Sequence, residues 1–532
     1  MSDAAALVSI LPLAAVVVPA IAAVFVYRIA DQVRRERGLL IGSILTTVII
    51  GAMILALLVG EPSRFSAGAF APGIPFELVG DPLGVAFAGF VALVYLAATP
   101  VIVSSQRRAH RSTGSRVYAC LLGSQAAVLC AALAGNVLIL FGALEVFTLV
   151  TYPLIANSED RQSRLAGYTY LVYGFTGGIA VLFGTRLVYA ETGVITFVSG
   201  GIPAVAAGGG SWALTGAGIL LVLGFGVKAA IVPLHGWLVR ARVANTAVFG
   251  TVFVGILTTA GMFGIVRVLS HVFGVGAPAL GPLRLFVVVL AATGAVFGGL
   301  MAIGVDRKID RLVYLVIIGT ALPLIGVSLI DIHPAIGGLG VASAHAASLL
   351  LCLLALSSID AETQAVEHRE AAQIAFWIGA VLLIGLVLLV GMGYLWVGGV
   401  GRAPLLLPIL AIVVGTHIVA LRPVILDWAP WRSPEVDRIE ASPGAGRHTV
   451  VNWTQIASEK SNAWASGLAN AILVSVRYPD QAISGVLPHS LRCRYEQISN
   501  QRPGTTGTKL RVVESLYVVG AVLALALVLG LR

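Results

Sequence analysis

Three ionisable side chains stand in long apolar stretches of the sequence. Glu145 lies in GALEVFTLVTYPLI, and Lys228 and His235 lie in GFGVKAAIVPLHGWL. If these stretches cross a membrane, each charge costs roughly 2.5–3.5 kcal/mol at a helix centre unless it is paired or hydrated. A carboxylate and an ammonium in otherwise apolar helices are therefore expected to form an ion pair.

An ion pair of this kind can act as a switch. The titrations of two interacting groups are coupled, so a proton or cation that reaches one group changes the protonation of the other. The first interpretation is a charge relay through Glu145 and Lys228. The alternative is a static pair that only locks two helices together.

Pro233 follows Lys228 by five residues and has no backbone N–H to donate to the carbonyl of Ala229. Free backbone groups at membrane depth are tolerated only where protein or water satisfies them. We therefore expect a broken, hydrated helix beside Lys228. His345 and His417, in later apolar stretches, complete the candidate ion-translocation residues, although a histidine hydrogen-bonded within the bundle is the alternative for His417.

The elements that position these residues must be membrane-spanning helices. The chain is 58% hydrophobic and 11% charged, against roughly 25% charged in a soluble domain. A span needs about 20 apolar residues, and the sequence predicts an all-α integral membrane protein of about fourteen transmembrane helices. The spans are expected near 5–26, 39–59, 83–103, 117–134, 137–156, 166–190, 214–234, 246–270, 283–304, 312–330, 335–357, 372–396, 404–421 and 512–531.

Basic residues gather in alternate loops between these spans, as they do in cytoplasmic loops. They are Arg28, Arg34, Arg35 and Arg37, then Arg107, Arg108, Arg111 and Arg116, then Arg161 and Arg164, then Arg240 and Arg242, then Arg307, Lys308 and Arg311, and then Arg369. This alternation predicts a multi-pass protein of the cell membrane with both termini on the outer face. It also explains the net charge of +9 by anionic lipid of the bilayer, without nucleic acid.

The sequence offers no ligands for a cofactor. Its four cysteines have no metal-ligand spacing, no glycine-rich phosphate loop follows a predicted strand, and no paired histidines suggest haem or zinc. We therefore expect no cofactor, no metal and no catalytic chemistry of the chain's own.

The motifs resemble the antiporter-like subunits shared by respiratory complex I, membrane-bound hydrogenases and Mrp-type sodium/proton antiporters. The similarity is best over about residues 80–320 and rests on four segments. These are the glutamate context 142–152, the lysine followed by Pro-x-His-x-Trp-Leu at 233–238, the turn DRKIDRLVY at 306–314, and Asp81-Pro82-Leu83.

The resemblance implies two inverted five-helix repeats. The helix near Pro233, which is expected to be broken, belongs to the first of them. It implies that Glu145 and Lys228 are the paired charges of the first half-channel, with His235 at its cytoplasmic end. The partners it implies are other membrane subunits of a large complex. The expected segments are helices 1–3 at 1–116, a first repeat at 117–270, a second repeat at 271–421, a cytoplasmic or interfacial segment at 422–511 and a last helix at 512–532.

The chain departs from the family in its second half, which we expect to be degenerate. Thr259 stands where the eighth helix usually bears a lysine or histidine, Leu349 replaces the lysine that usually follows His345, and the twelfth helix has no charge. His417 is a candidate substitute. Segment 422–511 is expected to contain an amphipathic helix, which either lies in the interface plane or packs only against its own bundle. Its apolar face comprises Trp453, Ile456, Trp464, Leu468, Ile472 and Val476.

Three functions remain open. The first is an antiporter-like subunit that moves protons or sodium ions through the glutamate and lysine, including within an ion-translocating oxidoreductase of the NADH:quinone or hydrogenase type. The second is a non-conducting subunit that holds such an assembly together. The third is the membrane half of a two-component uptake system.

Overall fold

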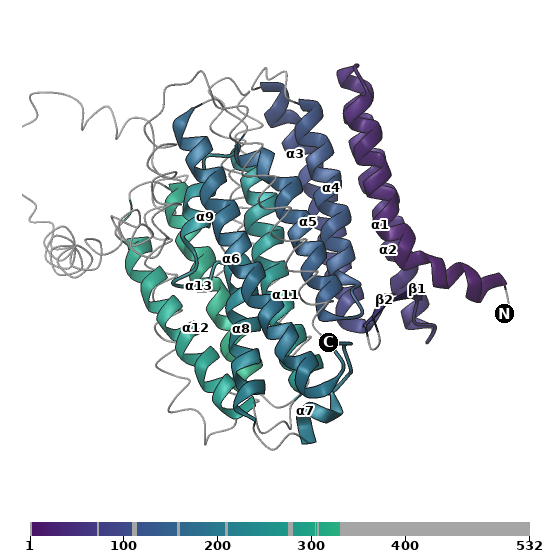
Figure 1. The fold of residues 1–532 in the computed structure, drawn as a ribbon. Helices are drawn as coiled ribbons and strands as arrows, with labels where there is room; N and C mark the ends of the chain where they lie inside the picture. The colour runs from purple at the N-terminus through teal and green to yellow at the C-terminus, as the bar shows by residue number, and fades with distance from the viewer. Residues whose placement is uncertain are drawn as a thin grey trace, which may run out of the picture.

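The computed structural model describes residues 3–71, 74–108, 114–156, 160–207, 211–274, 280–303, 305 and 308–329. The described part is a bundle of long helices that run up and down side by side (Figure 1). The predicted segments 422–511 and 512–532, most of the second repeat, and both His345 and His417 lie outside the described residues.

Helices form where the apolar runs predicted spans. The long helices are α1 (Asp3–Arg28), α2 (Gln32–Leu58), α3 (Pro82–Arg108), α4 (Gly114–Ala132), α5 (Val137–Ile155), α6 (Arg161–Thr192), α8 (Trp212–Lys228), α12 (Leu280–Ile303) and α13 (Lys308–Leu329). Within the described ranges, eight helices are long and apolar enough to cross a membrane, and Trp212–Lys228 is a shorter apolar helix. The helical membrane class is confirmed, while the total of about fourteen spans stays a prediction.

Basic residues mark one end of this bundle. α1 and α3 end, and α2, α4, α6 and α13 begin, at the same end, because each helix reverses the direction of the one before (Figure 1). The arginines at these helix termini include Arg28, Arg34, Arg107, Arg116, Arg161 and Arg311. We call this the basic end. That it faces the cytoplasm stays a prediction from the charge rule.

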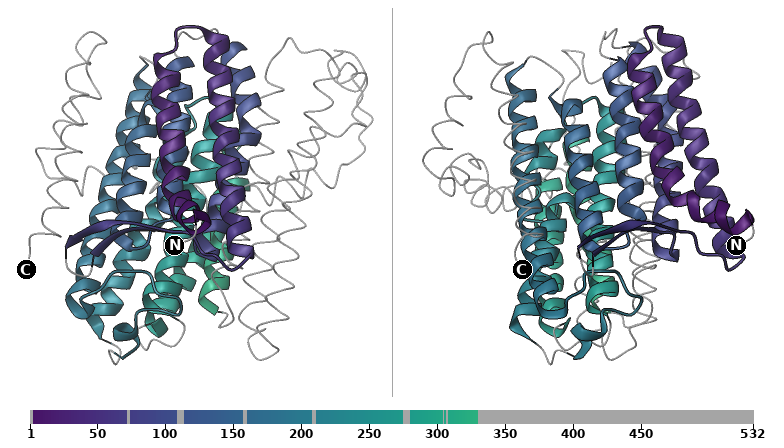
Figure 2. Two further views of the ribbon diagram at one scale, coloured as in Figure 1. Left: turned by 90° about the vertical axis from the view of Figure 1, so that its right-hand side faces the viewer. Right: turned by 45° about the vertical axis from the view of Figure 1, so that its right-hand side comes forward.

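A β-hairpin interrupts the helical pattern between α2 and α3, in a region for which the sequence predicted no regular element. Strands β1 (Arg64–Ala71) and β2 (Ile74–Val79) pair antiparallel and cross the helices toward the end opposite the basic end (Figure 2). The backbone N–H of Val79 donates to Leu133 O at 2.6 Å, and that of Gly135 to Glu77 O at 3.0 Å. The hairpin therefore closes over the turn between α4 and α5.

That turn is the shortest one predicted from the sequence, and it is confirmed. α4 ends at Ala132 and α5 begins at Val137. The side chain of Asn136 caps α5 by accepting a hydrogen bond from Ile139 N at 2.9 Å. A Cβ atom at Gly135 would lie 3.0 Å from Glu77 O, so a side chain there would press against the hairpin backbone.

The eighth predicted span is helical but is wound unevenly. It consists of α10 (Thr246–Val248), a π-helix η1 (Phe249–Leu257), α11 (Thr258–Arg267) and a second π-helix η2 (Val268–Phe273). Its membrane-crossing window is entirely buried, so it forms the centre of the described bundle. π-Helical turns are rare and occur frequently at functional sites, and no feature of the sequence predicted them.

Candidate functional site

Two buried charges meet in the middle of the bundle. Lys228 Nζ lies 3.0 Å from Glu145 Oε1, and the two side chains are 5% and 9% exposed. Lys228 Nζ also donates a hydrogen bond to Thr148 Oγ1 at 2.5 Å. The structure thus joins α5 and α8 through the ion pair that the isolated charges suggested, and we call Glu145 and Lys228 the relay pair.

Glycines on α6 and α8 make room for this pair. A Cβ atom at Gly178 would lie 3.1 Å from Glu145 Oε1, so the carboxylate lies against a position of α6 that has no side chain. A Cβ atom at Gly177 would lie 2.9 Å from Gly224 O, and one at Gly224 would lie 2.6 Å from Gly177 O. α6 and α8 therefore touch backbone to backbone, as small residues allow in membrane helices, and this contact fixes where Lys228 reaches α5.

The helix that bears the lysine ends at Lys228 itself. The predicted span to residue 234 is therefore wrong at its C-terminal end. Ala230 has a left-handed φ of 55°. The N–H of Ala230 bonds to Val227 O at 3.1 Å and that of Ile231 to Gly226 O at 3.0 Å. This is the Schellman arrangement, in which glycine usually occupies the left-handed position.

The predicted break is present, but Pro233 does not begin it. Pro233 lies in the non-helical segment between α8 and α9 (Gly236–Ala241), after the turn at Ala230 has already stopped the helix. The indole Nε1 of Trp237 donates to Val227 O at 2.6 Å. Protein therefore satisfies this freed carbonyl, one of the two means that membrane depth permits.

His235 lies beyond the break, outside the ion pair itself. Its side chain is buried, and its ring packs against Phe297 of α12 with centroids 4.9 Å apart. The structure thus places His235 between the broken helix and α12. Of the five candidate residues, the structure brings Glu145 and Lys228 into contact and places His235 beyond the helix break, and the other two lie outside the described residues.

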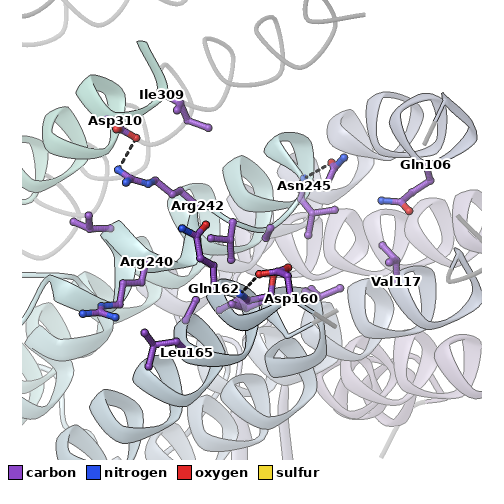
Figure 3. Close-up of a pocket in the computed structure, with 18 residues that line it drawn as sticks. Gln106, Val117, Asp160, Gln162, Leu165, Arg240, Arg242, Asn245, Ile309 and Asp310 are labelled. Carbon is purple, nitrogen blue, oxygen red and sulfur yellow. Dashed lines mark hydrogen bonds and ion pairs between the residues drawn. The ribbon is translucent and has the colours of Figure 1, made fainter. Parts of the chain in front are cut away.

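A cavity of about 630 Å³ opens at the basic end between α3, α5, α6 and the segment after the break. Its polar lining includes Gln106, Asp160, Gln162, Arg240, Asn245 and Asp310 (Figure 3). Arg242 Nη1 lies 2.6 Å from Asp310 Oδ1 across this cavity, which ties the segment after the break to α13. We call this space the basic-end cavity.

A second buried ion pair was not predicted from the sequence. Arg267, which is 1% exposed, pairs with Asp81, and its Nη2 donates to Asp81 Oδ1 at 2.6 Å. Burial alone would raise the pKa of Asp81, but the hydrogen bonds and charge of Arg267 outweigh it and lower this pKa. The signal that could have found the pair was a lone arginine inside a predicted span.

Around this pair the opposite end of the bundle is hollowed. A cavity of about 480 Å³ is lined by Arg64, Glu77, Asp81, Thr196 and His271, among others. His271 Nε2 lies 3.8 Å from Asp81 Oδ2. Polar cavities thus lie at both ends of the described bundle, with the relay pair buried within it.

Comparison with known proteins shows which proteins part of the chain resembles. Residues 134–315 match the family model described as NADH:quinone oxidoreductase/Mrp antiporter, transmembrane. The chain is 32% identical over 306 residues to NADH-quinone oxidoreductase subunit N of Desulforudis audaxviator, covering 55% of this chain and 58% of that protein. It is 24% identical over 196 residues to an Na(+)/H(+) antiporter subunit of Bacillus subtilis, covering 37% of this chain and 39% of that protein.

A solved structure shares the fold. A chain of the Mrp complex from Dietzia sp. DQ12-45-1b matches with a TM-score of 0.63 and 20% identity, over 79% of this chain and 80% of that chain. The chain spans about half the length of the first curated relatives, 58% and 48%. The family resemblance indicated by the motifs is confirmed over the matched segment.

Proposed function

We propose that this chain, whose residues 134–315 match the NADH:quinone oxidoreductase/Mrp antiporter family, is an antiporter-like subunit that moves protons or sodium ions through the relay pair. The observation that carries the proposal is the 3.0 Å contact between Lys228 and Glu145, buried beside a broken helix. Two buried charges with one hydroxyl neighbour can exchange a proton or respond to a passing cation with little movement.

The basic-end cavity supports the proposal of a path between the relay pair and solvent. The basic-end cavity lies at the level where α5 ends and α6 begins, and His235 lies in the segment that leads from the break toward it. We propose that His235 serves the same path, and that His345 and His417 continue it in the second half. We further propose that the chain works among other membrane subunits, as the names of its relatives suggest.

A non-conducting structural subunit is the second candidate, and one observation favours it. Thr259, at the position where the family usually has a lysine or histidine, is buried and donates only to Gly255 O at 2.9 Å. A charge relay that continued through α11 would lack an ionisable group there. The relay pair would then be a static link between α5 and α8.

Glu145→Gln, Lys228→Met and the double variant distinguish these candidates. In membrane vesicles that contain the chain with its natural partners, a relay predicts that each variant stops ion flux while the complex still assembles. A static pair predicts failed assembly in the single variants, because breaking a buried pair costs about 3–5 kcal/mol, and recovery of both assembly and flux in the double variant. Glu61→Gln, at an exposed position outside the bundle, is the control.

A further inference from the structure

An ion pair at the basic end fastens the broken helix to the next two long helices of the chain. Arg242 directly follows α9, and its Nη1 lies 2.6 Å from Oδ1 of Asp310 in the first turn of α13 (Figure 3). The Asp310 side chain is 9% exposed and that of Arg242 is 33% exposed. A buried carboxylate needs its cationic partner, because a buried charge left alone is costly. The pair therefore holds the end of α9 against α13.

α12 and α13 are themselves joined, so the ion pair fastens α9 to both. Arg311 donates from Nε to Ala302 O at 3.1 Å and from Nη2 to Val305 O at 2.6 Å, which closes the turn between the two helices. A Cβ atom at Gly298 would lie 2.8 Å from the side chain of Ile318, so the helices also pack closely beyond the turn. We call α12 and α13 together the α12–α13 hairpin.

The segment between the break and α9 rests on the same hairpin. The ring of His235 packs against Phe297 of α12. A Cβ atom at Gly294, three residues earlier on α12, would lie 3.9 Å from the side chain of Val232. The chain from the break to the end of α9 thus contacts α12 first and α13 last. A shift of the α12–α13 hairpin would carry this whole segment with it.

The segment is also bonded to the helix that bears the lysine. Trp237 of α9 donates from Nε1 to Val227 O at 2.6 Å, and Val227 directly precedes Lys228. α11 touches the same point, because a Cβ atom at Gly261 would lie 2.7 Å from the carbonyl carbon of Lys228. A movement of α9 therefore reaches Lys228 through one hydrogen bond and one peptide unit.

We propose that Arg242 and Asp310 are positioning residues for the relay pair, and that their ion pair passes movement of the α12–α13 hairpin to Lys228. This hairpin begins the predicted second repeat, and Thr259 gives α11 no ionisable group at the position where the family usually has one. The ion pair links the two halves mechanically instead. It sets the geometry of the relay pair and carries no proton itself. The proposal rests on the proposed function, because it concerns the placement of the same pair.

Asp310→Asn tests this link, because it keeps the shape of the side chain and removes its charge. In vesicles that contain the chain with its natural partners, ion flux per assembled complex should fall about tenfold or more, since misplacing a reacting group by about 1 Å can cost about a hundredfold. Asp310→Glu keeps the carboxylate and should retain most of the flux. Exchange of the two charges, Arg242→Asp with Asp310→Arg, should recover most of what Asp310→Asn loses.

Glu36→Gln is the matched control. The Glu36–Arg107 pair also lies at the basic end and also joins a buried carboxylate to a more exposed arginine, with exposures of 6% and 58%. It links α2 to α3, however, and not to the segment after the break. Ion flux per assembled complex should therefore equal that of the wild type.

The pH dependence of flux separates positioning from ion entry, since Arg242 and Asp310 also line the basic-end cavity. A displaced Lys228 changes the coupled titration of the relay pair. The pH of half-maximal flux should therefore shift by about one unit in Asp310→Asn, whereas altered entry alone would leave this pH unchanged.

Three outcomes would overturn the proposed link. Normal flux in Asp310→Asn, with flux stopped in Glu145→Gln, would refute the link and leave the relay pair standing. An unchanged pH of half-maximal flux would show that the two side chains do not act on Lys228. A charge exchange that conducts no better than Asp310→Asn would show that they do not act as a pair. Normal flux in Glu145→Gln would instead refute the proposed function.

Discussion

Removal of the Asp81 carboxylate should destabilise the protein far more than loss of an exposed charge. In Asp81→Asn the side chain keeps its shape, but Arg267 keeps a full charge at 1% exposure. The guanidinium lies over Phe197 and Phe263, 5.3 and 5.1 Å from the ring centroids, so aromatic faces remain its main neighbours. Leaving one partner of a buried pair alone costs about 3–5 kcal/mol.

The expected shift in Tm follows from the size of the chain. Unfolding entropy is about 2.1 cal/mol/K per residue, which gives about 1.1 kcal/mol/K over the 532 residues. A loss of 3–5 kcal/mol then corresponds to a Tm about 3–5 °C lower. Because membrane helices retain structure when they unfold in detergent, the true entropy is smaller and the shift is at least this large.

The assay is thermal unfolding of the purified complex in detergent, with two comparisons. Glu77→Gln removes the Arg64–Glu77 pair at the same end of the bundle, where Arg64 is 61% exposed, and should cost at most about 1 kcal/mol. Asp81→Asn combined with Arg267→Met removes both buried charges and should recover most of the loss. A shift for Asp81→Asn no larger than that for Glu77→Gln, or a double variant less stable than the single one, would refute this account of the pair.

The glycine contact at the relay pair, the end of α8 and the Asp81 carboxylate each allow a further test. Gly178→Ala places a methyl group about 3.1 Å from the carboxylate of the relay pair and should lower ion flux without loss of assembly. The control is Gly216→Ala, whose added methyl group meets no atom within 4 Å and which should conduct normally. Equal flux in the two variants would count against a role for the close contact at Gly178. Trp237→Phe keeps an aromatic ring but removes the 2.6 Å hydrogen bond to Val227 O, which still accepts from Ala230 N. The free energy of unfolding should therefore fall by about 0.5–1.5 kcal/mol, and an unchanged Tm would contradict this. The pKa of Asp81 is lower in the folded protein than its value of 3.8 in the unfolded chain, so the ionised carboxylate stabilises the fold, and this stabilisation is lost as pH falls through the folded-state pKa. The Tm difference between the wild type and Asp81→Asn should therefore be constant above about pH 5 and should shrink below about pH 4. A Tm difference that already shrinks near neutral pH would show that another group controls it.

The hydrophobic pattern of the chain was enough to predict a membrane environment, the helices and the charged residues of the site. The bilayer requires apolar runs of about 20 residues, and a run of that length is a local property of the chain. The turn at Gly135 could be placed for the same reason, since a short polar interruption is visible between two runs. Glu145 and Lys228 stood out because an uncompensated charge in hydrocarbon is costly, so each predicted the other.

Which groups meet, and where the broken helix ends, could not be predicted before the helices were seen packed together. Asp81 and Arg267 are 186 residues apart, and the local sequence at either position does not predict that the other residue is its partner. The turn that stops the helix has an alanine, Ala230, with a left-handed φ, a conformation that costs L-residues about 1–2 kcal/mol and that local preference would not choose. These features depend on contacts between distant segments, and such contacts exist only once the helices have packed.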